Sequence, residues 1–325
     1  MVSYSISRRR AAQRIGFWIA LAALSVWGLS NALAEPKAPS AARPAAKVAV
    51  KPAAKPAEPT APRYDLKYKF RVGEVVRSEV THRATVESTI EGTSQTAETR
   101  SKSVKAWRVT ETSPGRIKFV HMVESIDMWQ KTQGRAEVTY NSATDKKAPP
   151  GYEAVAAAVG VPLTEITMDD RGAIIKREQK QPQLDTQSPQ ITIPLPKEPV
   201  EVGHVWTAPL EIDVIVKGGA TRQIRTQQKF SLDKVQHGLA TISVDTQALT
   251  PVNDPVIEAQ LIQRLSSGTL QFDIDAGRIA GQELDLDRRV LGFSGPSSVM
   301  HYVTRYTEKL LPMAEATASK GKAKR

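Results

Sequence analysis

The sequence predicts a mainly β protein with minor α content, built as duplicated, curved antiparallel sheets with one short helix in each half and a half-barrel-like shape. Three observations predict this fold class. Apolar and polar residues alternate with a period of two through most of residues 64–311, as in half-buried strands. Turn motifs separate these runs, and the same order of elements occurs twice along the chain.

The strands follow from alternation between turns. Every second residue from Ile224 to Leu232 is suited to the same face, and residues 240–246 repeat the pattern. Ser113-Pro114-Gly115 and His237-Gly238 supply the turn chemistry that antiparallel hairpins need. Similar runs occur at 79–90, 103–110, 117–128, 210–216, 270–274 and 298–310.

The internal repeat begins with a shared motif. Val72-Gly73-Glu74-Val75 opens one half, and Val202-Gly203-His204-Val205 opens the other. Each half then contains strands joined by a turn and a short helix that starts just after a proline, at 152–159 and at 256–265. A hairpin follows each helix, at 166–174 and 270–279. A sheet covered by one short helix leaves apolar surface, so we expect the copies to pack together or to form one continuous sheet.

The amino-terminal residues predict export. Arg8 to Arg14 precede an apolar run from Ile15 to Leu29, and Ala32-Leu33-Ala34 supplies small residues for cleavage. This run is short for a bilayer crossing, so a cleaved signal is favoured over an uncleaved anchor. We therefore expect an exported protein, periplasmic or associated with the cell envelope, with membrane anchoring through this segment as the alternative.

The remaining segments complete the predicted organisation. Residues 35–63 are rich in Pro, Ala and Lys and contain almost no large apolar side chain, so they cannot form a core. Their spaced lysines are also suited to an anionic membrane or wall polymer. The predicted units are a signal peptide (1–34), a disordered linker (35–63), a first β repeat (64–180), a connector (181–199), a second β repeat (200–312) and a basic disordered tail (313–325). The insert 131–149 lengthens only the first copy, and its role is open.

Composition excludes several functions. The formal charge of +11 resides in the signal, linker and tail, which leaves residues 64–312 near neutral and argues against a nucleic-acid partner. The chain has no cysteine, so disulfides and thiolate chemistry are excluded.

No motif indicates a catalytic site, a metal site or a cofactor. The five histidines lack the spacing with which one strand or helix holds a metal ion. Asp273-Ile274-Asp275-Ala276-Gly277 is similar to part of a calcium loop, but Asp169-Asp170-Arg171-Gly172 occupies the equivalent place in the other copy, which favours a tight turn in both.

Large aromatic side chains are the candidates for lining a ligand cavity in the curved sheet. The alternative is that they form an ordinary sheet core. The candidates are Trp107, Phe119, Trp129, Trp206, Phe230, Phe272 and Tyr302.

A resemblance adds to this picture. The runs Tyr68-Lys69-Phe70, Pro199 to Trp206 and Gly268 to Asp273, with Gly277-Arg278-Ile279, resemble uncharacterised exported β-rich proteins of planctomycete-type bacteria. That group implies no activity and no functional residue. At the level of fold alone, a curved sheet with helices beside it is similar to the half-barrel of periplasmic lipoprotein carriers, which shield an acyl chain.

Two hypotheses for the function, from different classes of protein, are the main ones, and a third ranks below them. The leading hypothesis is a non-enzymatic envelope protein that binds a hydrophobic ligand or lipid moiety in its curved sheet. The alternative is a protein–protein interaction or scaffold module of the envelope with a filled core. An enzyme that uses a distributed carboxylate site is the third.

Overall fold

The computed structural model describes residues 61–181, 192–216 and 218–312, and confirms the predicted fold class. Strands make up 60% of the structure and helices 6%, and all strands join one antiparallel sheet that is not closed into a barrel. The strands are β1 (Val75–Ile90), β2 (Thr93–Ser113), β3 (Arg116–Thr132), β4 (Val138–Asn141), β5 (Pro162–Met168), β6 (Ile174–Gln179), β7 (Val205–Ile215), β8 (Thr221–Gln236), β9 (Leu239–Ala248), β10 (Ser267–Asp273), β11 (Arg278–Leu291) and β12 (Val299–Leu310). The helices are α2 (Glu153–Ala158), α3 (Pro255–Leu261) and the 3₁₀ helix η2 (Ile262–Arg264).

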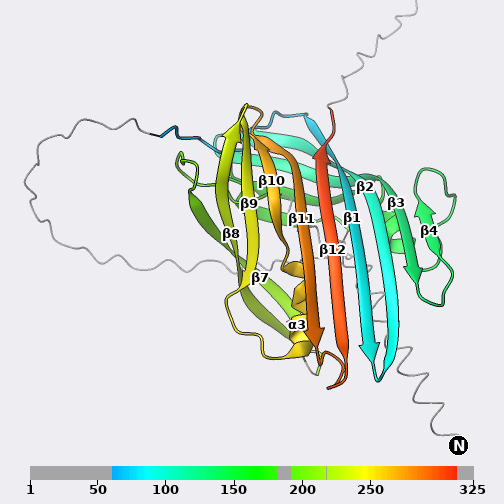
Figure 1. Ribbon diagram of the computed structural model, residues 1–325. Coiled ribbons are helices and arrows are strands. Elements are labelled where there is room, and N and C mark those ends of the chain that lie inside the picture. Colours follow the sequence, from blue (N-terminus) through cyan, green and yellow to red (C-terminus); the bar gives the residue numbers. More distant parts are fainter. Residues whose placement is uncertain (1–60, 182–191, 217, 313–325) are drawn as a thin grey trace, which may run out of the picture.

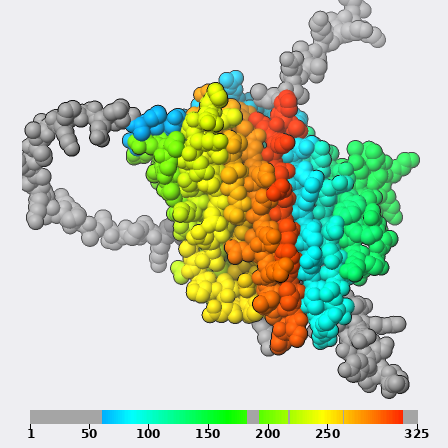
Figure 2. All heavy atoms as spheres, in the orientation of Figure 1, coloured from blue at the N-terminus to red at the C-terminus, as the bar shows by residue number. Residues whose placement is uncertain are grey.

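The sheet is continuous across both halves of the chain, in the order β6-β5-β3-β2-β1-β12-β11-β10-β9-β8-β7 (Figure 1). β4, within the insert, pairs only with β3 at the side of this path. The halves β6-β5-β3-β2-β1 and β11-β10-β9-β8-β7 have the same internal order, and β12 joins them. Figure 2 shows the second half in yellow and orange beside red β12 and cyan β1 and β2.

The entry to each half has the same hydrogen bonds. Gly73 N donates to Val109 O at 2.9 Å, and Gly203 N donates to Leu232 O at 2.7 Å. Both glycines have positive φ, at 82° and 90°, a conformation that other residues rarely adopt. The repeated motif is therefore a glycine turn that aligns the first strand of each half with the second.

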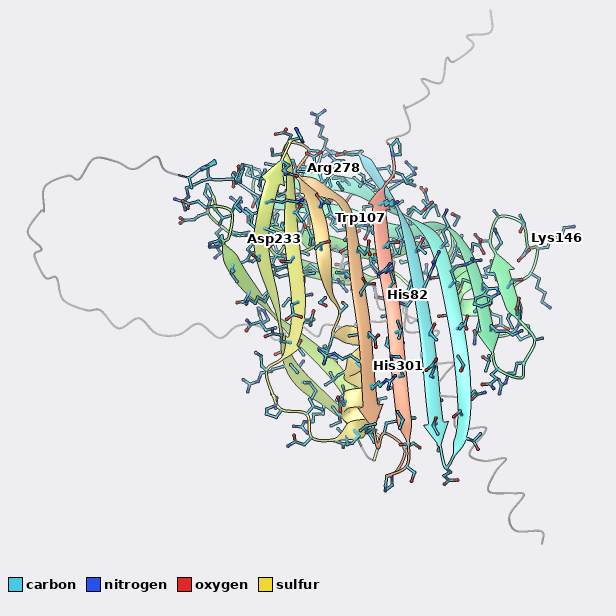
Figure 3. The ribbon with its side chains drawn as sticks, viewed as in Figure 1. His82, Trp107, Lys146, Asp233, Arg278 and His301 are labelled. Atoms are coloured by element: carbon cyan, nitrogen blue, oxygen red, sulfur yellow. The ribbon has the colours of Figure 1, made fainter. Side chains whose placement is uncertain are left out.

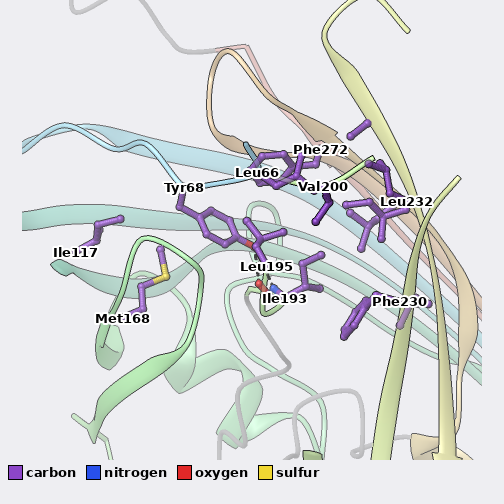
Figure 4. Close-up of a cluster of buried hydrophobic side chains, with 14 of the residues drawn as sticks. Leu66, Tyr68, Ile117, Met168, Ile193, Leu195, Val200, Phe230, Leu232 and Phe272 are labelled. Atoms are coloured by element: carbon purple, nitrogen blue, oxygen red, sulfur yellow. Dashed lines mark hydrogen bonds between the residues drawn. The ribbon is translucent and has the colours of Figure 1, made fainter. Parts of the chain in front are cut away.

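The two edges of the sheet share one apolar core, which requires the sheet to be curved. β3 and β9 are six strand spacings apart, or roughly 29 Å along a flat sheet. Side chains from both nevertheless pack into the cluster that we call the shared core (Figure 4). Its buried residues are Leu66, Tyr68, Val109, Ile117, Phe119, Ile166, Met168, Ile193, Leu195, Val200, Phe230, Leu232, Ala240, Ile242, Val244, Leu270 and Phe272.

Residues 64–70 lie between the two equivalent hairpins and bind to both. Tyr68 N donates to Asp170 O in the β5–β6 turn at 2.7 Å, and Lys69 N donates to Gly277 O in the β10–β11 turn at 2.9 Å. Figure 4 shows Leu66 and Tyr68 between side chains of the two halves. The amino-terminal segment therefore joins the halves at one end of the sheet.

Each of these turns has a glycine that allows close approach. A Cβ at Gly172 would lie 2.4 Å from Ile193 O, and one at Gly277 would lie 2.5 Å from the Lys69 side chain. Both glycines also have positive φ. Both reasons exclude a larger residue at these positions.

The short helices cover apolar parts of the same sheet. We call the residues that pack around α3 the α3 cluster: Ala84, Val86, Ala259, Ile262, Leu286, Val290 and Tyr302. On its other side α3 packs on β7 and β8, and the Gln260 side chain both donates to Ile215 O and accepts from Ile215 N at 2.8 Å. Asp254 caps the first turn by accepting from Val256 N. α2 packs on Ile126 and Met128 of β3.

Some predicted segments fall outside the described residues. These are the signal peptide (1–34), the linker up to residue 60, most of the connector and the tail from residue 313. The limits of the predicted repeats stay a prediction. Within the described ranges, no helix has both the length and the hydropathy needed to cross a membrane.

Replacing Gly172 by alanine tests the close approach of the β5–β6 turn to Tyr68 and Ile193. A Cβ there meets backbone as well as the strained φ, so we expect Gly172→Ala to lower the free energy of unfolding by about 3 kcal/mol or more. Gly115→Ala is the matched control, because Gly115 also has positive φ but nothing within 4 Å of the added Cβ. We expect it to cost about 1 kcal/mol. Equal losses in urea denaturation would contradict close approach at Gly172.

Candidate functional site

The candidate site lies on the inner face of the sheet, which we define as the face that carries the shared core and the α3 cluster. On β1 the even-numbered residues from Val76 to Ser88 face inward, and on β12 those from Met300 to Leu310 do so. The inner-facing residues between the two apolar clusters are mostly polar. They are Ser78, Val80, His82, Ser101, Ser103, Lys105, Gln282, Thr304, Tyr306 and Glu308.

Glu308 is the centre of a hydrogen-bond network that spans three strands. Its carboxylate accepts from Ser78 Oγ on β1 at 2.6 Å, from Gln282 Nε2 on β11 at 2.6 Å and from Tyr306 Oη at 2.8 Å. Charge-assisted bonds of this kind stabilise a partly buried carboxylate. Burial and the nearby Glu308 charge raise the pKa of Tyr306 well above its usual value, so its hydroxyl stays a donor.

Lys105 faces the same network from β2, where it lies opposite Ser78. Its Nζ lies 5.7 Å from the centre of the Tyr306 ring, within the range of a cation–π contact. No carboxylate of a described residue lies within 4.0 Å of this ammonium. Burial lowers the pKa of Lys105, and the charge of Glu308 opposes that shift.

His82 is held as a neutral imidazole. Thr304 Oγ1 donates to Arg83 O at 2.9 Å and lies 2.8 Å from His82 Nε2, so Nε2 donates to that hydroxyl. The buried Nδ1 then carries a lone pair with no hydrogen-bond partner among the described residues. Burial, and next the charge of Lys105, lower the pKa of His82 to about 4. Figure 3 marks its position on β1.

Two more basic groups face inward from the neighbouring strands. His121 lies on β3 opposite Trp107 and is 2% exposed; burial, Lys105 and Arg177 together lower its pKa to about 3. Arg177 lies on β6 opposite Ile166, and burial lowers its pKa as well. Arg177 forms no ion pair with any residue in the described ranges.

Five of the predicted cavity residues pack in or against the shared core. Phe119, Phe230 and Phe272 are at most 1% exposed within it. Trp107 stacks on Phe119 with ring centres 5.1 Å apart. Trp206 stacks on Phe230 at 5.5 Å and donates to Pro194 O at 2.7 Å. These five therefore help to fill one end of the curved sheet.

The other two predicted residues lie elsewhere. Tyr302 is on the inner face but belongs to the α3 cluster. Trp129 lies on the outer face, where its indole N–H donates to Glu137 at 3.2 Å. The reason is a β-bulge: Val104 and Lys105 pair with Ser125 and Val123, which leaves Glu124 as an extra residue that reverses the faces of the rest of β3. The seven residues do not line one common cavity.

The two Asp-Gly motifs form turns. Asp169 Oδ1 accepts from Arg171 N at 2.9 Å and from Ala173 N at 2.8 Å, and Asp273 Oδ1 accepts from Ala276 N at 2.8 Å. The hairpin interpretation is therefore confirmed. In the part of the chain that the structure describes, no three His, Asp or Glu side chains are grouped to hold a metal ion.

Comparisons with known proteins give likeness of fold only at a low level. No family model and no curated protein matches the chain. One similar solved structure is a lipovitellin described for its lipid–protein interactions, at 10% identity and a TM-score of 0.42, covering 77% of this chain and 26% of that one. The chain thus spans about a quarter of the length of that lipovitellin.

Two bacterial structures are also similar over most of their length. One is a DUF1329 family protein from Desulfovibrio piger, at 10% identity and a TM-score of 0.15, covering 70% of this chain and 83% of that one. The other is a putative outer membrane lipoprotein-sorting protein domain from Vibrio parahaemolyticus, also at 10% identity and a TM-score of 0.15, covering 74% and 87%. The resemblance to planctomycete-type proteins stays a prediction.

The buried histidines predict a loss of stability in acid. The unfolded chain takes up protons at His82 and His121 near pH 6.5, whereas the folded chain does so only near pH 4 and 3. The free energy of unfolding therefore falls as the pH drops from 6.5 to about 4, by about 3 kcal/mol for each histidine. We expect a shallower pH dependence for His82→Gln in urea denaturation at stepped pH. Identical slopes for the variant and the wild type would contradict a buried neutral imidazole.

Proposed function

We propose that this protein is a non-enzymatic binder of a hydrophobic ligand or lipid moiety, which occupies the inner face of the curved sheet between the shared core and the α3 cluster. We call this part of the inner face the trough. The observation that carries the proposal is the break in apolar packing along the four central strands β2, β1, β12 and β11. The shared core and the α3 cluster have no residue in common, and polar side chains separate them.

Val80 illustrates this break. It faces inward from the middle of β1 and is 4% exposed, yet it belongs to none of the apolar clusters that the described residues form. Its neighbours across the strands are Ser103 and Glu308. A lining that alternates small apolar groups with hydroxyls suits an amphiphile better than a purely apolar molecule.

The free energy available is adequate for binding. Each methylene group moved out of water contributes about 0.8 kcal/mol, so an acyl segment of ten methylenes contributes up to about 8 kcal/mol before ordering costs. The largest side chains of the shared core pack on one another and fill one end of the curved sheet. The aromatic residues predicted from the sequence therefore support one end of the trough, and the central strands line it.

The cellular setting of the proposal comes from the sequence. An export signal followed by a long basic linker fits a protein that works in the bacterial envelope near a membrane. Contacts of the linker with anionic lipid or wall polymer belong to the same proposal.

A second candidate is an interaction module, which the filled shared core and the open sheet edges favour. Among the described residues, β6 and β7 each have one side without a strand partner, and Ile175, Val205 and Ile215 on them are 44%, 46% and 58% exposed. Such an edge can accept an added strand.

A bulky side chain in the trough tests the first proposal. We expect Val80→Trp to reduce binding of the fluorescent fatty acid cis-parinaric acid at least tenfold, because the indole occupies the inner face. Thr81→Trp is the matched control, since this adjacent residue faces outward and should leave binding unchanged. Circular dichroism melting confirms that both variants fold. Binding that is absent in the wild type, or equal in both variants, would contradict ligand binding in the trough.

A further inference from the structure

We infer that the trough binds an anionic head group, a carboxylate or a phosphate, through the inward-facing cations Lys105 and Arg177. The inference rests on the proposed function and specifies the class of ligand. It comes from the inner-face charges of the first half, and no sequence motif marks these residues.

Lys105 and Arg177 share one face of the sheet with two neutral histidines, His82 and His121, and we call these four residues the cluster. His82 lies on β1, Lys105 on β2, His121 on β3 and Arg177 on β6, each at an inward position of its strand. Lys105 lies close enough to His82 and His121 to lower their pKa values, and Arg177 lies close enough to His121 to lower its pKa. The positive potential of this part of the inner face therefore comes from Lys105 and Arg177, which both lie near His121.

Glu308 offsets part of the positive charge of Lys105, whereas Arg177 has no ion-pair partner among the described residues. Glu308 is the inner-face acid beside Lys105, and its two oxygens already accept three hydrogen bonds. Neither Lys105 nor Arg177 forms an ion pair within the described ranges. A buried charge without a partner is costly, and an anion that enters the trough removes that cost.

A buried hydroxyl next to the cluster lacks a partner. Thr164 on β5 is 0% exposed, lies opposite His121, and its Oγ1 has no hydrogen-bond partner among the described residues. This hydroxyl can donate to an oxyanion, as can the fork of N–H groups on Arg177 and the ammonium of Lys105. Three kinds of donor therefore face inward on neighbouring strands of the first half.

A matched set of probes tests this assignment on the full chain. We expect oleate to bind at least tenfold more tightly than oleyl alcohol, which has the same chain without the charge, in displacement of cis-parinaric acid. Lys105→Met and Arg177→Met should each weaken oleate binding about tenfold and leave oleyl alcohol unchanged. The control variants Lys102→Met and Lys176→Met remove a lysine from the outer face of β2 and from β6, and should bind both probes as the wild type does.

The outcomes separate the inference from the proposed function. Equal affinity for oleate and oleyl alcohol would overturn the anionic head group while leaving the hydrophobic ligand in place. Binding of neither amphiphile would overturn the proposed function. The last binding measurement uses inorganic phosphate alone. If phosphate binds through Lys105 and Arg177 and oleate does not bind, the site takes a free anion, and a lipid source of the anion is contradicted.

Discussion

The contact on which the rest of the structure depends is the attachment of residues 64–70 to two hairpins that are far apart in sequence. Tyr68 binds the turn after β5, and Lys69 binds the turn after β10, so a single short segment connects the two halves. Tyr68 Oη also donates to Ile193 O and accepts from Ile193 N, which ties in residues 192–200. These bonds add to the intrinsic twist of the sheet and hold its two halves together over the shared core.

The shared core joins the two halves at one end of the sheet, and this explains why the middle of the inner face can be polar. The shared core and the α3 cluster bury most of the apolar surface, so the central strands are not required to do so. Glu308, Lys105 and His82 can therefore occupy inward positions that an ordinary sheet core would fill with valine or leucine. Their desolvation lowers stability, and such a cost is typical of residues retained for binding rather than for folding.

Much of the fold follows from the sequence. Alternation predicts the strands, and the Val-Gly motifs, the helices after proline and the Asp-Gly hairpins predict a repeated order of elements that both halves of the sheet share. Predicting the polar network was not possible in the same way, because Ser78 and Glu308 meet over 230 positions of sequence and only the pairing of β1 with β12 brings them together. Alternation also gives no sign of the bulge at Glu124, which is why Trp129 lies on the outer face.

Native mass spectrometry of the protein purified gently from its own host, before and after organic extraction, tests the central claim most directly. A binder of lipid-like molecules retains its ligand through such a purification when the ligand is buried. We expect a mass above that of the bare chain by the mass of a lipid-sized adduct, which extraction removes. A bare mass that extraction leaves unchanged would contradict a ligand in the trough and favour the interaction module.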